Sequence, residues 1–311
     1  MSSVFGPIPS RRLGRSLGIN NIPPKVCSYS CIYCQLGNTD FMSIKRRDFF
    51  SPDEIYNEAV KKVCQLRKRK EKVDYITFVP DGEPTFDINL GKTIEKLRNL
   101  KIKIAVVTNS SLVWIKEIQD DLMKADLVSV KIDTVFENIW KKINRPHGIL
   151  KLNKIMQGIV EFAARFKGKL ITETMLVKGI NDTVESMYKT ASFIEQIHPE
   201  KAFILVPTRP PAEASVRIPD DNSLSAAHQI YTGIIGKAEL LTGNEGTNFS
   251  FTSEAEKELL DILAVHPMRT DAVEEFLLRA NSNMDLINNL IYKNILKTTE
   301  FYGSTYYVQN K

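Results

Sequence analysis

The stretch VDYITFVPDGEPTFDINLGKTIEKLRNLKIKIAVVT, residues 73–108, decides the fold class. It begins and ends with short apolar runs rich in β-branched residues, which are typical of buried strands. Between these runs, apolar residues recur at three- and four-residue intervals, as they do in a helix. The order strand, helix, strand predicts two parallel strands joined by a helical crossover, with functional loops at the carboxyl ends of the strands.

The same pattern continues along the chain. Further apolar runs begin at Asp126, Lys169 and Lys201, with helix-like stretches at 112–125, 148–166 and 183–197. An earlier strand around residues 15–22 and a helix over 53–70 give six βα units before residue 243. Six units are too few for a closed eight-unit barrel. We expect an α/β protein with a partial barrel, followed by a loop over 207–221, a helix over 223–241 and a linker over 242–248.

The chain changes character from residue 252 onward. Three helix-like stretches precede two strand-like runs about a Gly-containing turn, an order that resembles a winged helix. We therefore expect a barrel over residues 1–245 and a small winged-helix-like domain over 252–311. Residues 253–311 carry six Lys/Arg against nine Asp/Glu, a net charge of −3. An acidic module is a poor phosphate binder, so we expect this tail to contact protein or to pack structurally rather than to bind DNA.

The composition is that of a globular protein, with 43% hydrophobic and 25% charged residues. No apolar run approaches the roughly 18 residues of a membrane span. The opening MSSVFGPIPSRRLGRSLG has no apolar core for a signal peptide. We therefore expect a cytoplasmic protein without a membrane partner.

The basic excess is concentrated in one stretch. Residues 41–72 carry ten Lys/Arg against five Asp/Glu, a local net charge of +5 that equals the net charge of the whole chain. Such a run is either a solvated helix end or a surface that attracts an anionic substrate.

Three of the four cysteines, Cys27, Cys31 and Cys34, lie within eight residues in the segment NNIPPKVCSYSCIYCQLG, residues 20–37. A tight cluster in a chain of this kind indicates metal or redox chemistry rather than a disulfide framework. Thiolates so spaced on one loop can converge on a soft metal centre.

A structural zinc site is one alternative for this cluster. Its fourth ligand would come from Cys64 or from one of the four histidines, His147, His198, His228 and His266. Zinc loops usually pair their ligands as two CxxC-like hairpins, and the sequence contains no second pair. Cys64, beside Val63 on the helix over 53–70, has the pattern of a small buried hydrophobe.

A cubane [4Fe-4S] cluster held by three thiolates leaves one iron open for chemistry. CxxxCxxC with Tyr33 before the third cysteine resembles the motif of the radical S-adenosylmethionine (SAM) enzymes. The resemblance covers about residues 1–245. It implies a partial (βα)6 barrel of TIM type, a [4Fe-4S] cluster on Cys27, Cys31 and Cys34, and SAM on the open iron. It also implies an electron donor such as flavodoxin or ferredoxin, and reductive cleavage of SAM to a 5′-deoxyadenosyl radical that abstracts hydrogen from a substrate.

The resemblance extends to the ends of the predicted strands. In VPDGEPTF, Gly82 and Glu83 match a Gly-Gly-Glu-like motif that meets the SAM amino group, while Asp81 replaces the first glycine. The resemblance also implies polar or main-chain contacts to SAM or substrate for Tyr33, Thr108, Asn109, Lys131, Asp133, Glu173 and Val206. The segment INRPHG offers Arg145 and His147 as groups on the substrate side.

More narrowly, PSRRLGRSLGIN followed by the cysteine segment looks like a group of radical SAM proteins allied to the tRNA wyosine-base (4-demethylwyosine) synthases. The wyosine enzymes have a second cysteine triplet, and this chain has only Cys64 to spare, which argues against wyosine synthesis itself. The substrate is expected to be either RNA or a nucleotide, favoured by the basic stretch, or a protein or peptide. The alternative function is an iron–sulfur or zinc regulatory protein that acts through its winged-helix tail.

Overall fold

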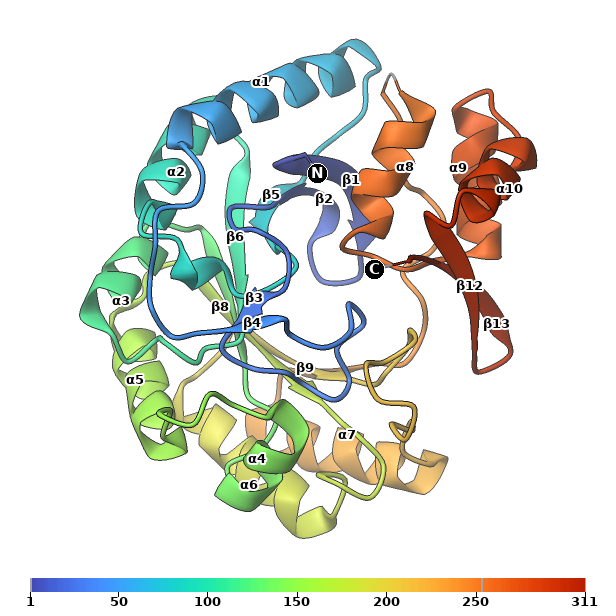
Figure 1. Ribbon diagram of the computed structural model, residues 1–311. Coiled ribbons are helices and arrows are strands. Elements are labelled where there is room, and N and C mark those ends of the chain that lie inside the picture. Colours follow the sequence, from blue (N-terminus) through green and yellow to red (C-terminus); the bar gives the residue numbers. More distant parts are fainter. Residues whose placement is uncertain (1, 253, 311) are drawn as a thin grey trace.

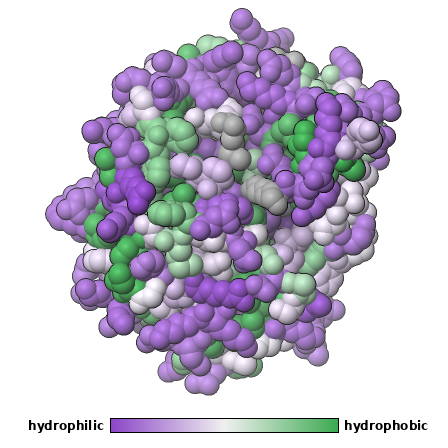
Figure 2. All heavy atoms as spheres, viewed as in Figure 1, coloured by the Kyte–Doolittle hydropathy of each residue, from purple (hydrophilic) through white to green (hydrophobic). Residues whose placement is uncertain are grey.

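The computed structural model describes residues 2–252 and 254–310. In this part of the chain the main sheet has eight strands, hydrogen-bonded in the order β1 (Val4–Ser10), β2 (Gly14–Ile19), β5 (Tyr75–Phe78), β6 (Lys103–Thr108), β7 (Leu127–Lys131), β8 (Lys169–Met175), β9 (Lys201–Leu205) and β10 (Ala238–Leu241). Neighbours from β2 to β10 are parallel, and β1 is antiparallel to β2. The sheet curves, and helices cover its outer side (Figure 1). The side chains seen in Figure 2 are mainly hydrophilic.

The outer layer consists of helices that connect successive parallel strands. Its members are α1 (Pro52–Lys68), α2 (Leu90–Leu97), α3 (Lys116–Leu122), α4 (Glu137–Asn144), α5 (Leu152–Arg165), α6 (Val184–Gln196) and α7 (Asp221–Ile235), with short 3₁₀ turns at Pro84–Phe86 and Arg98–Leu100. Helix α1 shows how the sequence specifies them. The Ser51 side chain caps it by accepting from the Asp53 amide at 3.2 Å, and Pro52 lies in its first turn.

The C-terminal segment packs against strand β1. It contains α8 (Ala255–Leu263), α9 (Thr270–Arg279), α10 (Met284–Tyr292) and an antiparallel sheet in the order β11 (Met268–Arg269), β13 (Ser304–Gln309), β12 (Leu296–Phe301). Phe5 and Ile8 of β1 belong to the same apolar core as the inner faces of these helices. Figure 1 shows the segment beside β1, at one edge of the curved sheet.

The structure corrects the sequence-based prediction of a helix over 223–241. Helix α7 ends at Ile235, and Gly236 follows it with a φ of +76°. Residues 238–241 then form a seventh parallel strand, with Ala238 opposite Ala202 and Leu241 opposite Leu205 of β9. Glycine just after a helix is the usual stop signal, and it outweighs the apolar pattern that continues beyond it.

The prediction that Cys64 is buried is also wrong. The buried residues of α1 are Ile55, Ala59, Val63 and Leu66, which define one stripe of the helix. Cys64 lies about 100° around the helix from Val63 and is exposed. Its side chain therefore faces away from the sheet.

Asp87, just after the 3₁₀ turn at Pro84–Phe86, provides a test of the packing around that turn. Its buried carboxylate accepts from the Asn89 amide at 2.8 Å and from the Asn21 side chain at 3.2 Å. Burial raises the pKa of Asp87 from 3.8 to about 6. The stabilising contribution of Asp87 is thus present below its unfolded-state pKa and is lost as the pH rises through its folded-state pKa.

We expect Asp87→Asn to remove this pH dependence. A shift of two pKa units corresponds to about 3 kcal/mol, so the free energy of unfolding of the wild type should fall by about that much relative to the variant between about pH 4 and pH 7. Denaturant unfolding at several pH values measures this difference, and Asp40→Asn, at an exposed carboxylate, is the control. Parallel pH profiles for the wild type and Asp87→Asn would contradict the expectation.

Candidate functional site

The cysteine segment is held in place by main-chain hydrogen bonds to one other loop and to the end of a helix. Cys27 ends β3 (Val26–Cys27), which pairs with β4 (Phe41–Met42). The Val26 carbonyl accepts from the Glu83 amide at 3.1 Å, and the Ile32 amide donates to the Ile143 carbonyl at 3.0 Å. The loop after β5 and the last turn of α4 therefore fix the backbone that carries the three thiols.

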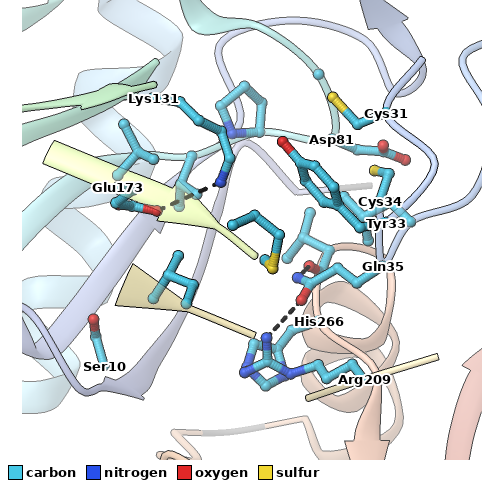
Figure 3. Close-up of a pocket in the computed structure, with 18 of the residues that line it drawn as sticks. Ser10, Cys31, Tyr33, Cys34, Gln35, Asp81, Lys131, Glu173, Arg209 and His266 are labelled. Atoms are coloured by element: carbon cyan, nitrogen blue, oxygen red, sulfur yellow. Dashed lines mark hydrogen bonds and ion pairs between the residues drawn. The ribbon is translucent and has the colours of Figure 1, made fainter. Parts of the chain in front are cut away.

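Cys27, Cys31 and Cys34 line one cavity of about 340 Å³, which runs from the cysteine segment into the curved sheet and along the C-terminal segment (Figure 3). Burial raises the pKa of all three thiols, for Cys31 to about 12. Asparagine side chains donate toward two of the sulfurs, Asn109 to Cys27 Sγ and Asn144 to Cys31 Sγ, each at 3.4 Å.

The donor set fits a soft, multinuclear metal group. Three cysteines come from one loop into one cavity, and thiolate is the ligand that iron–sulfur clusters use. Hydrogen bonds from Asn109 and Asn144 are of the kind that tunes such ligands. Within residues 2–252 and 254–310, no group of three or more His, Cys, Asp or Glu side chains is arranged as a metal-ion site.

Tyr33 is held by a buried polar network behind Cys31. Its hydroxyl donates to Asp133, and Asn144 donates to Asp133 at 2.7 Å and to the Tyr33 oxygen at 3.2 Å. The second carboxylate oxygen of Asp133 accepts from the Met175 amide at 2.8 Å. Burial, and then the charge of Asp133, raise the pKa of Tyr33, so its hydroxyl stays protonated as a donor.

The Glu83 side chain does not line the cavity, and it supports the residues around it through hydrogen bonds. Its carboxylate accepts from the hydroxyls of Thr85 and Thr108, each at 2.7 Å, and from the Asn109 amide at 2.7 Å. The side chain is 1% exposed. Burial raises the pKa of Glu83, although these hydrogen bonds act in the opposite direction. Glu83 therefore orients the loop that presents Asn109 to Cys27.

A charged group extends along the cavity at strands β7 and β8. Glu173 pairs with Arg12, lies 3.8 Å from Lys131 Nζ and accepts from Ser129. Burial acts to raise the pKa of Glu173, but Arg12 and Lys131 outweigh it, so the pKa is lowered and the carboxylate is ionised. Lys131 Nζ also lies 5.2 Å from the centre of the Tyr33 ring.

The structure brings the predicted site residues into two layers. One layer lines the cavity and contains Cys27, Cys31, Cys34, Tyr33, Gly82, Lys131, Glu173 and Val206. The other supports that lining through hydrogen bonds and contains Glu83, Thr108, Asn109 and Asp133. Arg145 instead forms an ion pair with Glu213, and His147 is bonded through its amide to Ser28.

Sequence reasoning missed a second polar cluster on the cavity wall. Arg209 donates to Gln35 at 2.5 Å, contacts His266 Nε2 at 2.8 Å and pairs with Glu245 at 2.5 Å. Gln35 also donates to the Val265 carbonyl at 3.1 Å. Gln35 follows Cys34 directly, which is a usable signal, whereas nothing local marks His266 or Glu245.

Much of the basic stretch over 41–72 makes structural contacts. Arg46 pairs with Asp121 at 2.5 Å, Lys62 pairs with Glu258 of α8 at 2.8 Å, and Arg67 donates to the Leu100 carbonyl at 2.9 Å. These three side chains join α1 and its preceding loop to neighbouring elements.

No helix among the described residues is long and apolar enough to cross a membrane.

Comparison with known proteins gives consistent matches. A family model described as the radical SAM superfamily matches residues 21–194. A UPF0026 protein of Methanocaldococcus jannaschii is 45% identical over 312 residues, covering 100% of this chain and 97% of that one.

Among solved structures, a radical SAM methyltransferase from Sphaerobacter thermophilus is similar with a TM-score of 0.54 and 14% identity, covering 73% of this chain and 66% of that one. TYW1 with a lysine-pyruvate adduct bound is similar with a TM-score of 0.47 and 14% identity, covering 95% of this chain and 80% of that one. At this identity the likeness to the methyltransferase concerns the fold, an α/β architecture with a mostly parallel sheet.

Proposed function

The chain belongs to the radical SAM superfamily, where the UPF0026 proteins are its homologues, and from this premise we propose that it holds a [4Fe-4S] cluster on Cys27, Cys31 and Cys34 and cleaves SAM reductively. The observation that carries the proposal is the convergence of these thiols, from one CxxxCxxC loop, on one end of a cavity inside the curved sheet. When bound, the cluster supplies one electron that splits SAM into methionine and a 5′-deoxyadenosyl radical, which abstracts hydrogen from the substrate.

Different residues at the strand ends are proposed to contact different parts of SAM. Gly82 exposes main-chain groups on the cavity wall and is proposed to meet the SAM amino group. Glu83, which the Gly-Gly-Glu-like motif would place at the same contact, is proposed to act here as a positioning residue through Thr108 and Asn109. We propose that the carboxylate, ribose and adenine of SAM lie along the part of the cavity wall that is formed by Lys131, Glu173 and the Val206 backbone.

Two features support the exclusion of water from this site. Tyr33 is fixed by Asp133 and Asn144, so its ring forms a rigid part of the wall beside Lys131. The apolar side chains Met175, Leu205 and Val206 line the same cavity. A dry, shaped cavity protects a radical from side reactions.

We further propose that residues 1–245 form a partial (βα)6 barrel and residues 252–311 a winged-helix-like unit. Helices α8, α9 and α10 followed by the hairpin of β12 and β13 support the second assignment. His266 and Val265 of this unit line the same cavity as the cysteines, which favours a role in the active site over DNA binding. The electron donor is proposed to be a flavodoxin or ferredoxin, and the substrate a nucleotide, RNA, peptide or protein.

The decisive experiment is anaerobic reconstitution with iron and sulfide, followed by reduction with dithionite in the presence of SAM. We expect 5′-deoxyadenosine and methionine to accumulate together. A cluster-loaded, reduced protein that binds SAM and forms neither product would overturn the proposal. Retention of iron without SAM cleavage, together with binding of duplex DNA, would favour the regulatory alternative.

A further inference from the structure

The end of the cavity away from the cysteines carries an excess of positive charge. The whole lining contains five Lys/Arg and three Asp/Glu residues. Lys25 and Asp81 lie at the cysteine end, 3.7 Å apart. Lys131 lies beside Tyr33. The remainder consists of Arg11, Arg12 and Arg209 against Glu173 and Glu245. The far part of the cavity therefore has one more cation than anions.

Arg11 is the cation with the least compensation in this group. Its Nη1 donates to the main-chain carbonyls of Leu241, at 3.1 Å, and Gly243. Among residues 2–252 and 254–310, no carboxylate forms an ion pair with Arg11, whereas Arg12 pairs with Glu173 and Arg209 with Glu245. Carbonyl oxygens fix one edge of the guanidinium, and the charges of Glu245 and Glu173 act on it only from beyond ion-pair distance.

The surroundings of Arg11 favour an anion. Burial, and then the charge of Arg209, lower the pKa of Arg11, which means that its charged form is destabilised as the site stands. An added carboxylate or phosphate relieves this by charge-assisted, bidentate hydrogen bonds, for which a guanidinium is well shaped. Figure 3 shows Arg209 and His266 together, on the side of the cavity away from the labelled Cys31 and Cys34.

We propose that this end of the cavity, built from Arg11 and Arg209 and closed by His266 of the C-terminal segment, binds an anionic group of the substrate, a carboxylate or a phosphate. The inference rests on the proposed function in that the substrate must enter the same cavity as SAM. In this proposal the C-terminal segment has a role in substrate binding, because His266 of this segment positions Arg209 through a 2.8 Å contact. Gln35, next to Cys34, holds the other side of the same guanidinium.

The test measures binding of inorganic phosphate and of malonate to the full-length, cluster-loaded protein by anaerobic calorimetry, with and without saturating SAM. We expect at least one anion to bind in both conditions, and the tighter of the two identifies the phosphate or carboxylate class. Arg11→Gln should weaken this binding by about tenfold or more, as expected for loss of a charge-assisted pair. Arg98→Gln, outside the cavity, should leave it unchanged.

A second variant acts in the opposite direction and so separates binding from misfolding. Glu245→Gln removes the counter-ion of Arg209 and should tighten anion binding several-fold. No binding by the wild type, or weaker binding by Glu245→Gln in a folded protein, would overturn the inference. Competition between the anion and SAM would also overturn it, since the cations would then hold the SAM carboxylate.

SAM cleavage without added substrate, measured on the same preparations, keeps the two proposals apart. If the protein binds an anion but does not cleave SAM, the proposed function is wrong and the anion site stands. If the protein cleaves SAM but binds neither anion, the anion site is wrong and the proposed function stands.

Discussion

Cys31→Ser is expected to lose the cluster and to form no 5′-deoxyadenosine above the background without protein. The serine hydroxyl fits the volume and can still accept from Asn144, which donates to the sulfur at 3.4 Å in the wild type. The fold should therefore survive, while a neutral hydroxyl replaces a soft thiolate ligand. Iron and sulfide content, the visible absorption of the cluster and product formation measure the loss.

Cys64→Ser is the matched control for this variant. Cys64 is exposed on α1 and outside the cavity, so its replacement should leave iron content and SAM cleavage unchanged. Equal losses in both variants would point to non-specific thiol chemistry. Full activity of Cys31→Ser would exclude Cys31 as a ligand and would remove the basis of the proposed function.

The parallel strands from β5 to β9 were predictable because each contains a short apolar run, which is the sequence pattern of a strand buried on both faces. The predicted helices over 53–70, 148–166 and 183–197 correspond to α1, α5 and α6. Strand β10 was not predictable from its apolar pattern, because residues 238–241 continue the spacing of α7 and only Gly236 interrupts it. Its strand conformation depends on pairing with β9.

The site was predictable only where its signal is local. The CxxxCxxC loop and the residues at strand ends are close to one another because parallel strands end at one edge of the sheet. The direction of each side chain was not predictable, and Glu83 turned out to face Thr108 and Asn109. His266 and Glu245 reach the cavity through packing of distant segments, a long-range contact that leaves no mark in the neighbouring sequence.

Gly82→Ala should have the second largest effect, because a side chain at this position has no space. The φ of Gly82 is +149°, a conformation that residues with a Cβ rarely adopt. An added Cβ would lie well inside van der Waals contact of the Val26 carbonyl oxygen, which is main chain and cannot rotate away. Relief requires Val26 and the adjoining Cys27 to move, so strain and a lost contact to the Glu83 amide together should destabilise the fold by about 4 kcal/mol.

Two other glycines separate the causes of this loss. Gly179 has a φ of +70° with open space around it, so Gly179→Ala tests backbone strain alone. Gly148 also has open space around it, and its φ lies outside the left-handed region, so Gly148→Ala tests neither strain nor a steric clash. We expect the melting temperature to be highest for Gly148→Ala, lower for Gly179→Ala and lowest for Gly82→Ala, and the iron content to fall only in Gly82→Ala. Because Gly82 and Val26 form an isolated bridge, a Gly82→Ala protein that keeps its iron would show that the cysteine loop does not depend on its contact with the segment after β5.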